Sequence, residues 1–156
     1  MAARQRLETY LREEGVPFDT LIHSVAYTAQ EVAAAQHTPG SQLAKVVLAD
    51  ADGKMVMLVL PASYRVDFPK LKSALKADKV RLAREDEFAG TFTDCEVGAM
   101  PPFGNLYDVP VCVDGCLCDT SEIVFKVGGH TTSMKMKYSD YERLVKPDIV
   151  DFAAHL

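Results

Sequence analysis

Two apolar runs of equal length constrain the fold of this chain more than any other feature. They read LAKVVLAD at residues 43–50 and KMVMLVLP at residues 54–61, with Asp52-Gly53 between them. Each run has the length of a strand, and Asp-Gly between two such runs is a strong signal for a two-residue hairpin turn. The sequence therefore predicts a central β-hairpin.

Length and composition place this hairpin in one ordinary domain. The 156 residues can bury one sizeable core and are too few for two typical domains, so we assign residues 1–156 to a single domain. No apolar run approaches the roughly 18 residues of a membrane span. The chain opens with MAARQRLETYL, a helical polar pattern and not a secretory signal, so we expect a cytoplasmic protein.

Helices and strands are expected on both sides of the hairpin. Before it, the pattern predicts a helix over residues 2–14, a strand over 18–23, and an alanine-rich helix running from a Thr28/Glu31 capping box to Gln36. After it come a helix over 67–75 capped by Asp67, a strand over 79–83, a helix over 84–90, a hairpin around Asp114-Gly115, strands over 122–127 and 131–138, and a last helix opened by Ser139 and ended by Pro147. This order predicts a mixed α+β domain, in which helices surround a sheet of about six or seven strands.

The four cysteines do not match a common metal site. Three of them form a Cys-x3-Cys-x-Cys pattern with no nearby histidine, which is not a usual zinc spacing. The expected turn at Asp114-Gly115 would also place Cys112 on the face opposite Cys116 and Cys118. We therefore interpret Cys95 and these three residues as reduced, small apolar side chains and expect no metal.

The net charge of −5 argues against a protein that coats nucleic acid with its whole surface. Two runs leave room for a local basic patch, although solvated faces of ordinary elements explain each run equally well. The two runs comprise Lys70, Lys72, Lys76, Lys79, Arg81 and Arg84, and then Lys135, Lys137, Arg143 and Lys146.

Lys45 departs from the pattern of its own strand. It lies inside the run from Leu43 to Ala49, where both strand faces are otherwise apolar. Burying an unpaired ammonium costs several kcal/mol, so the side chain must reach water, find a partner or face a wet cavity. A lysine at a strand edge and a functional lysine in a pocket both remain open.

His130 is the second unusual position, because it follows Gly128-Gly129 at the expected start of a strand. It has the same parity as Met134 and Met136, so a regular strand would point its ring inward at the mouth of the sheet. The glycine pair would let a ligand or another segment approach the backbone closely. A hydrogen-bonded core histidine is the competing interpretation.

The third unusual feature is the segment EVGAMPPFG at residues 96–104. Pro101 and Pro102 make it stiff and remove two backbone donors, while Gly98 and Gly104 at its ends can adopt positive φ. We expect the carbonyls and the amides of residues 98–100 to remain available. A structural turn and a backbone wall for a ligand are both consistent with this segment. No nucleophile elbow, zinc helix or phosphate loop competes with these three positions.

Taken in order, these features resemble the YbaK/prolyl-tRNA-synthetase-associated editing domain family. The matching pieces are IHSVAYTAQEVA at 22–33, LAKVVLA at 43–49, VGAMPPFG at 97–104 and VFKVGGHTTSMKMKYSDYERL at 124–144. The resemblance implies a partly barrel-like mixed sheet and a free-standing deacylase. Such an enzyme hydrolyses the ester that links a wrong amino acid to the terminal adenosine of a tRNA, with no cofactor.

The resemblance also implies roles for individual residues. Lys45, Gly98 and His130 are the expected catalytic set. Lys45 would provide positive charge near the terminal phosphate or ester oxygen, the backbone of residues 98–102 would position the water and the adenosine, and His130 would bound the amino-acid pocket. The expected substrate-binding residues are His23, Ala99, Met100, Pro101, Pro102, Phe103, Gly104, Gly128 and Gly129, with Phe103 as the candidate for stacking on the single-stranded end.

The expected partner is the acceptor end of a mischarged tRNA, with a synthetase or an elongation factor as a further candidate helper. Alanine or cysteine on the tRNA for proline is the first expectation for the substrate. Two other hypotheses remain open at this point: a non-catalytic binding module that senses a tRNA end, a nucleotide or an amino acid, and an interaction domain whose motifs are structural only.

Overall fold

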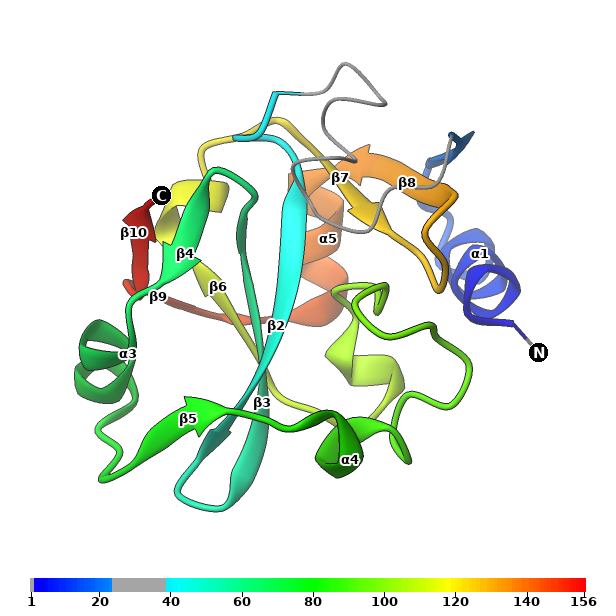
Figure 1. The fold of residues 1–156 in the computed structure, drawn as a ribbon. Helices are drawn as coiled ribbons and strands as arrows, with labels where there is room; N and C mark the ends of the chain where they lie inside the picture. Colours follow the sequence, from blue (N-terminus) through cyan, green and yellow to red (C-terminus); the bar gives the residue numbers. More distant parts are fainter. Residues whose placement is uncertain (1, 24–38) are drawn as a thin grey trace.

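The computed structural model describes residues 2–23 and 39–156 (Figure 1). The capping box at Thr28 and the alanine-rich helix expected after it lie outside the described residues. The helices are α1 (Ala3–Glu13), α3 (Phe68–Leu75), α4 (Glu85–Phe88) and α5 (Tyr138–Val145). The strands are β1 (Asp19–Ile22), β2 (Ala44–Ala51), β3 (Lys54–Pro61), β4 (Tyr64–Val66), β5 (Val80–Leu82), β6 (Val111–Asp114), β7 (Glu122–Lys126), β8 (Thr132–Lys137), β9 (Asp148–Val150) and β10 (Ala153–His155).

The predicted central hairpin is confirmed. Strands β2 and β3 pair antiparallel along their whole length, from Ala44 opposite Pro61 to Ala51 opposite Lys54. Asp52 and Gly53 both have positive φ, 52° and 85°, as a two-residue turn with the twist of a hairpin requires. This hairpin lies inside a five-stranded sheet in the order β5-β2-β3-β6-β9, whose last three strands are parallel.

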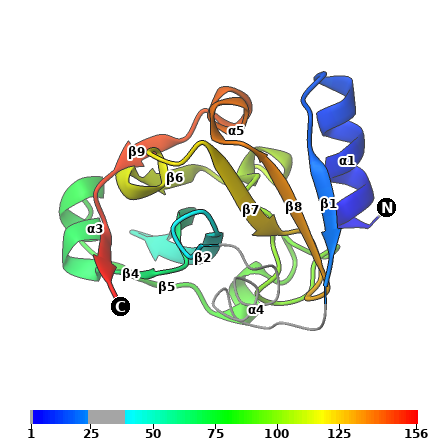
Figure 2. The ribbon, with the colours of Figure 1, turned by 90° about the horizontal axis from the view of Figure 1, so that it is seen from above.

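A second, antiparallel sheet has the order β1-β8-β7. It meets the first sheet at one point, a parallel bridge between Leu43 and Val124. Seen from above, helix α1 lies along the outer side of β1 (Figure 2). A short third sheet pairs β4 with β10 near the C-terminus.

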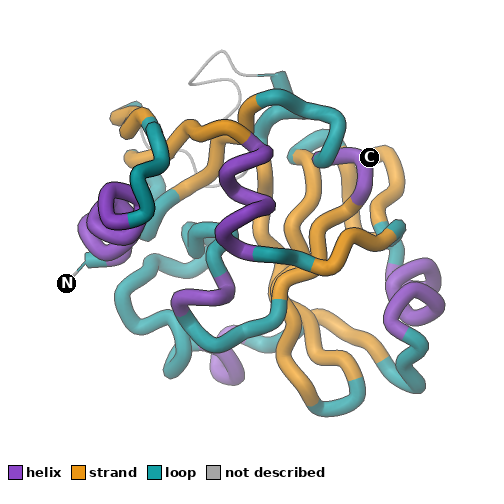
Figure 3. The backbone as a smooth tube through the Cα atoms, turned by 180° about the vertical axis from the view of Figure 1, so that it is seen from behind, coloured by secondary structure: helices purple, strands orange, loops and turns teal. Residues whose placement is uncertain are grey.

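The main hydrophobic core lies between the two larger sheets and includes side chains from both helices α1 and α5. Leu7 and Leu11 of α1, Phe125 of β7 and Tyr141 of α5 are fully buried in it. The view from behind shows α5 crossing this side of the molecule (Figure 3). Both helices have apolar residues three or four positions apart, and these residues form the buried face of each helix. The α+β class is therefore confirmed.

The expected hairpin at Asp114-Gly115 is wrong. Residues Gly115–Leu117 form a 3₁₀ turn, and β6 pairs with β3 and β9. The reason is the Asp114 carboxylate, which accepts the amide of Cys116 at 2.9 Å and the amides of Phe152 and Ala153 at 2.9 and 2.8 Å. The last two donors come from the chain terminus, so the turn depends on a contact that is distant in sequence.

Two further details also differ from the expectation. The described strands form three sheets instead of one. Strands β4, β9 and β10 were not expected, because three residues are too few to show a period of two. Helix α5 begins one residue before Ser139, and its first turn has no side-chain cap. The cap of α3 by Asp67 is confirmed, since its carboxylate accepts the Lys70 amide at 3.1 Å.

Candidate active site

The segment 96–104 begins with a β-turn at the surface. The Ala99 amide donates to the Glu96 carbonyl at 3.0 Å, and Gly98 has φ +81°, as the third residue of a type II turn requires. Val97 is 51% exposed. Within the described residues, the Gly98 amide has no backbone acceptor.

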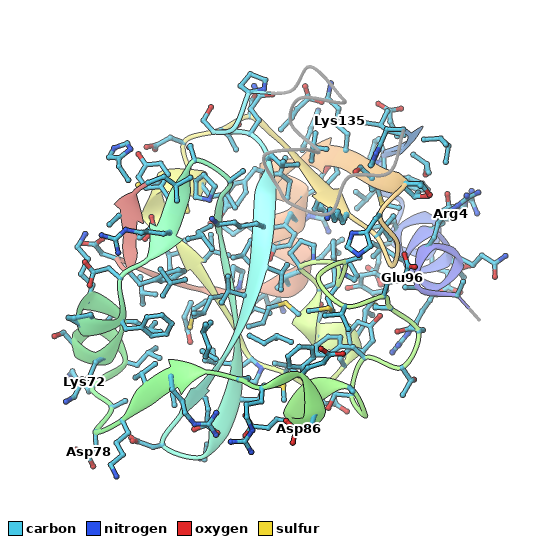
Figure 4. The ribbon with its side chains drawn as sticks, in the orientation of Figure 1. Arg4, Lys72, Asp78, Asp86, Glu96 and Lys135 are labelled. Atoms are coloured by element: carbon cyan, nitrogen blue, oxygen red, sulfur yellow. The ribbon has the colours of Figure 1, made fainter. Side chains whose placement is uncertain are left out.

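The turn is bound to the connection between β7 and β8. Gly128 donates its amide to the Ala99 carbonyl at 2.7 Å and accepts the Glu96 amide at 2.9 Å. Gly128 has φ +85°, and a Cβ at this position would lie 2.8 Å from the Ala3 Cβ of α1. Only glycine meets both requirements. Figure 4 shows Glu96 between the β7–β8 turn and the start of α1.

His130 contacts this turn through one ring nitrogen and its backbone amide, and its other ring nitrogen contacts Lys126 of β7. Nε2 lies 2.9 Å from the Val97 carbonyl, Nδ1 lies 2.9 Å from the Lys126 Nζ, and the His130 amide donates to the Glu96 carboxylate at 3.2 Å. The ring also lies against Gly98, where a Cβ would be 3.7 Å from its Cε1. The structure thus brings Gly98 together with Gly128 and His130, which lie about thirty residues further along the chain.

Lys45 reaches the same side of the molecule from β2. Its neighbour two residues back, Leu43, is bridged to Val124, and Lys126 follows Val124 by two residues in the same direction. Alternate residues of a strand share a face, so Lys45 shares the face of Leu43 and Lys126 shares the face of Val124. Leu43 and Val124 lie outside the main core, so the two lysines both face away from it. A common cavity for Lys45 and the turn at Gly98 remains a prediction.

The environment of Lys45 is unusual for a cation. The side chain is half-buried, and among the described residues it makes no hydrogen bond or ion pair. This burial lowers the pKa of Lys45 below its ordinary value, because desolvation disfavours the ammonium form. A half-buried ammonium in this situation is suited to binding an anion or a developing negative charge.

His23 extends the same face from the end of β1. Its backbone amide donates to the Thr131 carbonyl at 2.9 Å, and its Nε2 lies 2.8 Å from the Ser133 Oγ. Ser133 is fully buried and lies opposite Lys126 in the β7–β8 ladder. The two polar side chains of His23 and Ser133 therefore lie beside the Lys126–His130 pair.

The buried half of the segment differs from the expectation. Residues 99–104 are all buried, and the Ala99 amide and carbonyl are both used in internal hydrogen bonds. Gly104 has no room for a ligand, because a Cβ there would lie 2.3 Å from the Val109 carbonyl oxygen. Of the whole segment, only its first turn is exposed.

The stacking role expected for Phe103 is wrong. Its side chain is 0% exposed, and its ring packs against Tyr10, Phe125 and Tyr141 with centroids 5.3 to 6.3 Å apart. Pro101 and Pro102 are buried beside it, and the Pro102 carbonyl accepts the Tyr141 hydroxyl at 2.7 Å. These residues hold the turn in place and cannot contact a base in this structure.

Sequence reasoning missed Lys126 and Ser133. The signal for Lys126 was the one that identified Lys45, a lysine inside an apolar strand, here EIVFKV. The inward parity assigned to His130 is also wrong, because β8 begins at Thr132 and His130 belongs to the turn before it. The positive φ of Gly128 interrupts the alternation.

The cysteines do not form a site of their own among the described residues, although Cys95 directly precedes the turn that begins at Glu96. All four are free, and Cys112 is buried in β6, where burial raises the pKa of its thiol to about 11. Across residues 2–23 and 39–156, no cluster of histidine, cysteine and acidic side chains could hold a metal ion. No helix in the same residues is long and apolar enough to cross a membrane.

Comparison with known proteins identifies the family. Residues 23–144 match the aminoacyl-tRNA editing domain, which is most of the chain. The chain is 30% identical to the multifunctional Ser/Thr-tRNA deacylase ProXp-y of Escherichia coli, over 95% of this chain and 91% of that protein. It is 31% identical to the proline–tRNA ligase of Desulfovibrio desulfuricans over 76% of this chain and only 20% of the ligase.

Solved structures show the same fold. The hypothetical protein APE2540 superposes with a TM-score of 0.85 at 20% identity, covering 95% of this chain and 99% of that one. A protein described provisionally as a trans-editing enzyme for prolyl tRNA synthetase gives a TM-score of 0.83 at 18% identity, covering 99% and 98% of the two chains. The chain belongs to the aminoacyl-tRNA editing domain family, whose members are aminoacyl-tRNA deacylases.

Proposed function

We propose that this protein acts in trans to deacylate tRNA that carries a wrong, small amino acid. One observation supports the mechanism most directly: the half-buried Lys45 ammonium has no hydrogen-bond or ion-pair acceptor among the described residues. The second group in this proposal is the Gly98 N–H, which has no backbone acceptor among the described residues. These are the groups that an ester hydrolase needs for the negative charge of its substrate and transition state.

The proposed reaction is attack by water on the carbonyl carbon of the aminoacyl ester. The bond from that carbon to the ribose oxygen breaks, the ribose oxygen takes a proton, and free amino acid and tRNA result. The neighbouring ribose hydroxyl can assist the proton transfer, so the protein mainly orients the ester and stabilises the oxyanion. Lys45 provides positive charge at the phosphate or ester oxygen, and the Gly98 N–H donates to the water or the oxyanion.

The substrate is a small amino acid. Alanine or cysteine on the tRNA for proline is our first expectation, and the name of the E. coli relative adds serine and threonine. The polar pair of His23 and Ser133 on the site face supports a place for a hydroxyl group in the pocket. Discrimination between these four amino acids as substrates depends on a few contacts in the pocket. One methylene group changes the ratio of kcat/KM values only about tenfold to 200-fold.

The test is a deacylation panel with alanyl-, cysteinyl-, seryl- and threonyl-tRNA, using the wild type, Lys45→Ala and Lys54→Ala. Lys54 is an exposed lysine in β3 and serves as the matched control. We expect the wild type to release at least one amino acid, Lys45→Ala to lose most of that activity, and Lys54→Ala to retain it. A wild type that is inactive on all four substrates would favour the non-catalytic binding module.

The pH dependence provides a second test of Lys45. Because burial lowers its pKa, the ammonium that we propose to act is present below this pKa and is lost as pH rises through it. After subtraction of spontaneous ester hydrolysis, kcat/KM should therefore decline at a lower pH than an ordinary lysine would give. The Lys45→Arg variant, if active, should lack this decline because arginine stays charged.

A further inference from the structure

Lys126 occupies the last position of β7, directly before the glycine turn. It lies opposite Ser133 in the ladder and is only 8% exposed. A buried ammonium requires acceptors, and one acceptor of Lys126 is the His130 Nδ1 at 2.9 Å. Lys126 is thus committed to contacts within the protein, whereas Lys45 makes no such contact among the described residues.

The hydrogen bonds of His130 determine which ring nitrogen carries its proton. The Val97 carbonyl can only accept, so His130 Nε2 must donate to it. The Lys126 ammonium can only donate, so His130 Nδ1 must accept from it. These two contacts fit the Nε2–H tautomer of the imidazole, and both ring nitrogens are already engaged in this structure.

This arrangement also sets the direction of the Gly98 N–H. The Val97 carbonyl and the Gly98 amide belong to one peptide group, which is planar and trans, so its C=O and N–H point in opposite directions. A ring that holds the Val97 oxygen consequently points the Gly98 N–H away from itself. That N–H is the donor without a backbone acceptor among the described residues.

We propose that Lys126 is a positioning residue for the deacylase: through His130 it fixes the Val97–Gly98 peptide so that the Gly98 N–H points at the reacting ester. The part of this inference that names an ester as the target of the Gly98 N–H rests on the proposed function. The chain of contacts itself, Lys126 to His130 to Val97, is independent of which substrate is bound. His130 in this arrangement is an orienting group and not a general base, because neither nitrogen is available to take a proton from water.

The first experiment measures the tautomer of His130 by ¹⁵N NMR of the imidazole nitrogens. The chain has four histidines, so the signals of His130 are assigned by their loss in His130→Gln. In the wild type we expect the Nε2–H tautomer, and in Lys126→Met a changed Nδ1 shift. Lys135→Met, which removes a partly exposed lysine of β8, is the control and should leave His130 unchanged. A wild-type Nδ1–H tautomer would overturn the proposal without any assay of activity.

The second experiment is a kinetic double-mutant cycle on a substrate that the panel identifies. Lys126→Met should lower kcat/KM by about tenfold to 100-fold, mainly in kcat, because a small misplacement of a positioned group has this size of effect. If Lys126 acts through His130, the double variant Lys126→Met/His130→Ala should be no slower than His130→Ala alone. Losses that multiply, or an unchanged Lys126→Met, would contradict the proposal.

Two further measurements separate positioning from stability. Lys126→Arg keeps a donor for Nδ1 and should recover part of the lost activity, whereas a purely structural role predicts changes in melting temperature without a matching change in kcat. If Lys126→Met does not fold, the His130 tautomer measured in the wild type and the activity of Lys126→Arg still test the proposal. If the wild type proves inactive on every substrate, the proposed function fails, and the NMR result alone tests the contact chain.

Discussion

The segment from Gly98 to Gly104 has the same residue type at its two ends, in opposite situations. Gly98 is exposed, has φ +81°, and meets no atom of another segment closer than 3.7 Å from its Cβ position. Gly104 is buried with the Val109 carbonyl 2.3 Å from that position. The first glycine leaves its backbone exposed at the surface, and the second lets two parts of the chain pack together. A glycine at each end of a loop therefore does not mean the same thing at both ends.

The buried end explains why the exposed end can be rigid. Phe103 packs among three aromatic rings, and Tyr141 donates to the Pro102 carbonyl, so the last residues of the segment are fixed in the core. Pro101 and Pro102 limit the backbone between this anchor and the turn. The stiffness inferred from the two prolines therefore limits how far the Gly98 turn can move relative to the anchored residues Pro102 and Phe103.

The largest expected effect comes from removing the anchor. Phe103→Ala should lower the free energy of unfolding by about 3 to 5 kcal/mol, since it empties a fully buried aromatic site. Urea denaturation measures this loss, and Leu82→Ala, at a position 57% exposed, is the control that should change little. A cost below about 1 kcal/mol would mean that the buried end is not the anchor.

A smaller effect is expected from crowding the buried glycine. Gly104→Ala should cost about 2 to 3 kcal/mol, because the new methyl group meets backbone that cannot move aside easily. The control is Gly90→Ala, where a Cβ meets nothing within 4 Å and φ is not positive. Equal stability of the two variants, measured by thermal unfolding, would remove the distinction between a packing glycine and a surface glycine.

The exposed glycine should show the smallest loss of stability with a separate loss of function. Gly98→Ala should cost about 1 to 2 kcal/mol from its left-handed backbone, and its deacylation rate should fall as well. Gly53→Ala is the matched control, because Gly53 has φ +85° with open space but lies in the hairpin turn of β2 and β3. Similar stability losses with reduced activity only for Gly98→Ala would show that the exposed glycine has a role in the reaction. Equal activities of the two variants would show that it has none.

Local patterns explain which predictions succeeded. The β2–β3 hairpin and the cap of α3 depend on residues within a few positions of each other, so the sequence determines them. Lys45 was identified because an ammonium inside an apolar strand is costly wherever the strand lies. The hairpin at Asp114-Gly115 failed because the Asp114 carboxylate binds amides of Phe152 and Ala153, which no local pattern reveals.

The sequence alone determined the fold class, the central hairpin, the stiffness of the segment at Pro101-Pro102 and the anomaly at Lys45. These follow from side-chain period, turn chemistry and the cost of burying charge, which act over short distances along the chain. The exposure of Gly98, the packing of Gly104 and the contacts of His130 with Lys126 and Val97 become visible in the folded structure alone. The His130–Val97 contact joins positions 33 residues apart, and hydrogen-bond direction and packing space exist only once the sheets have brought these segments together.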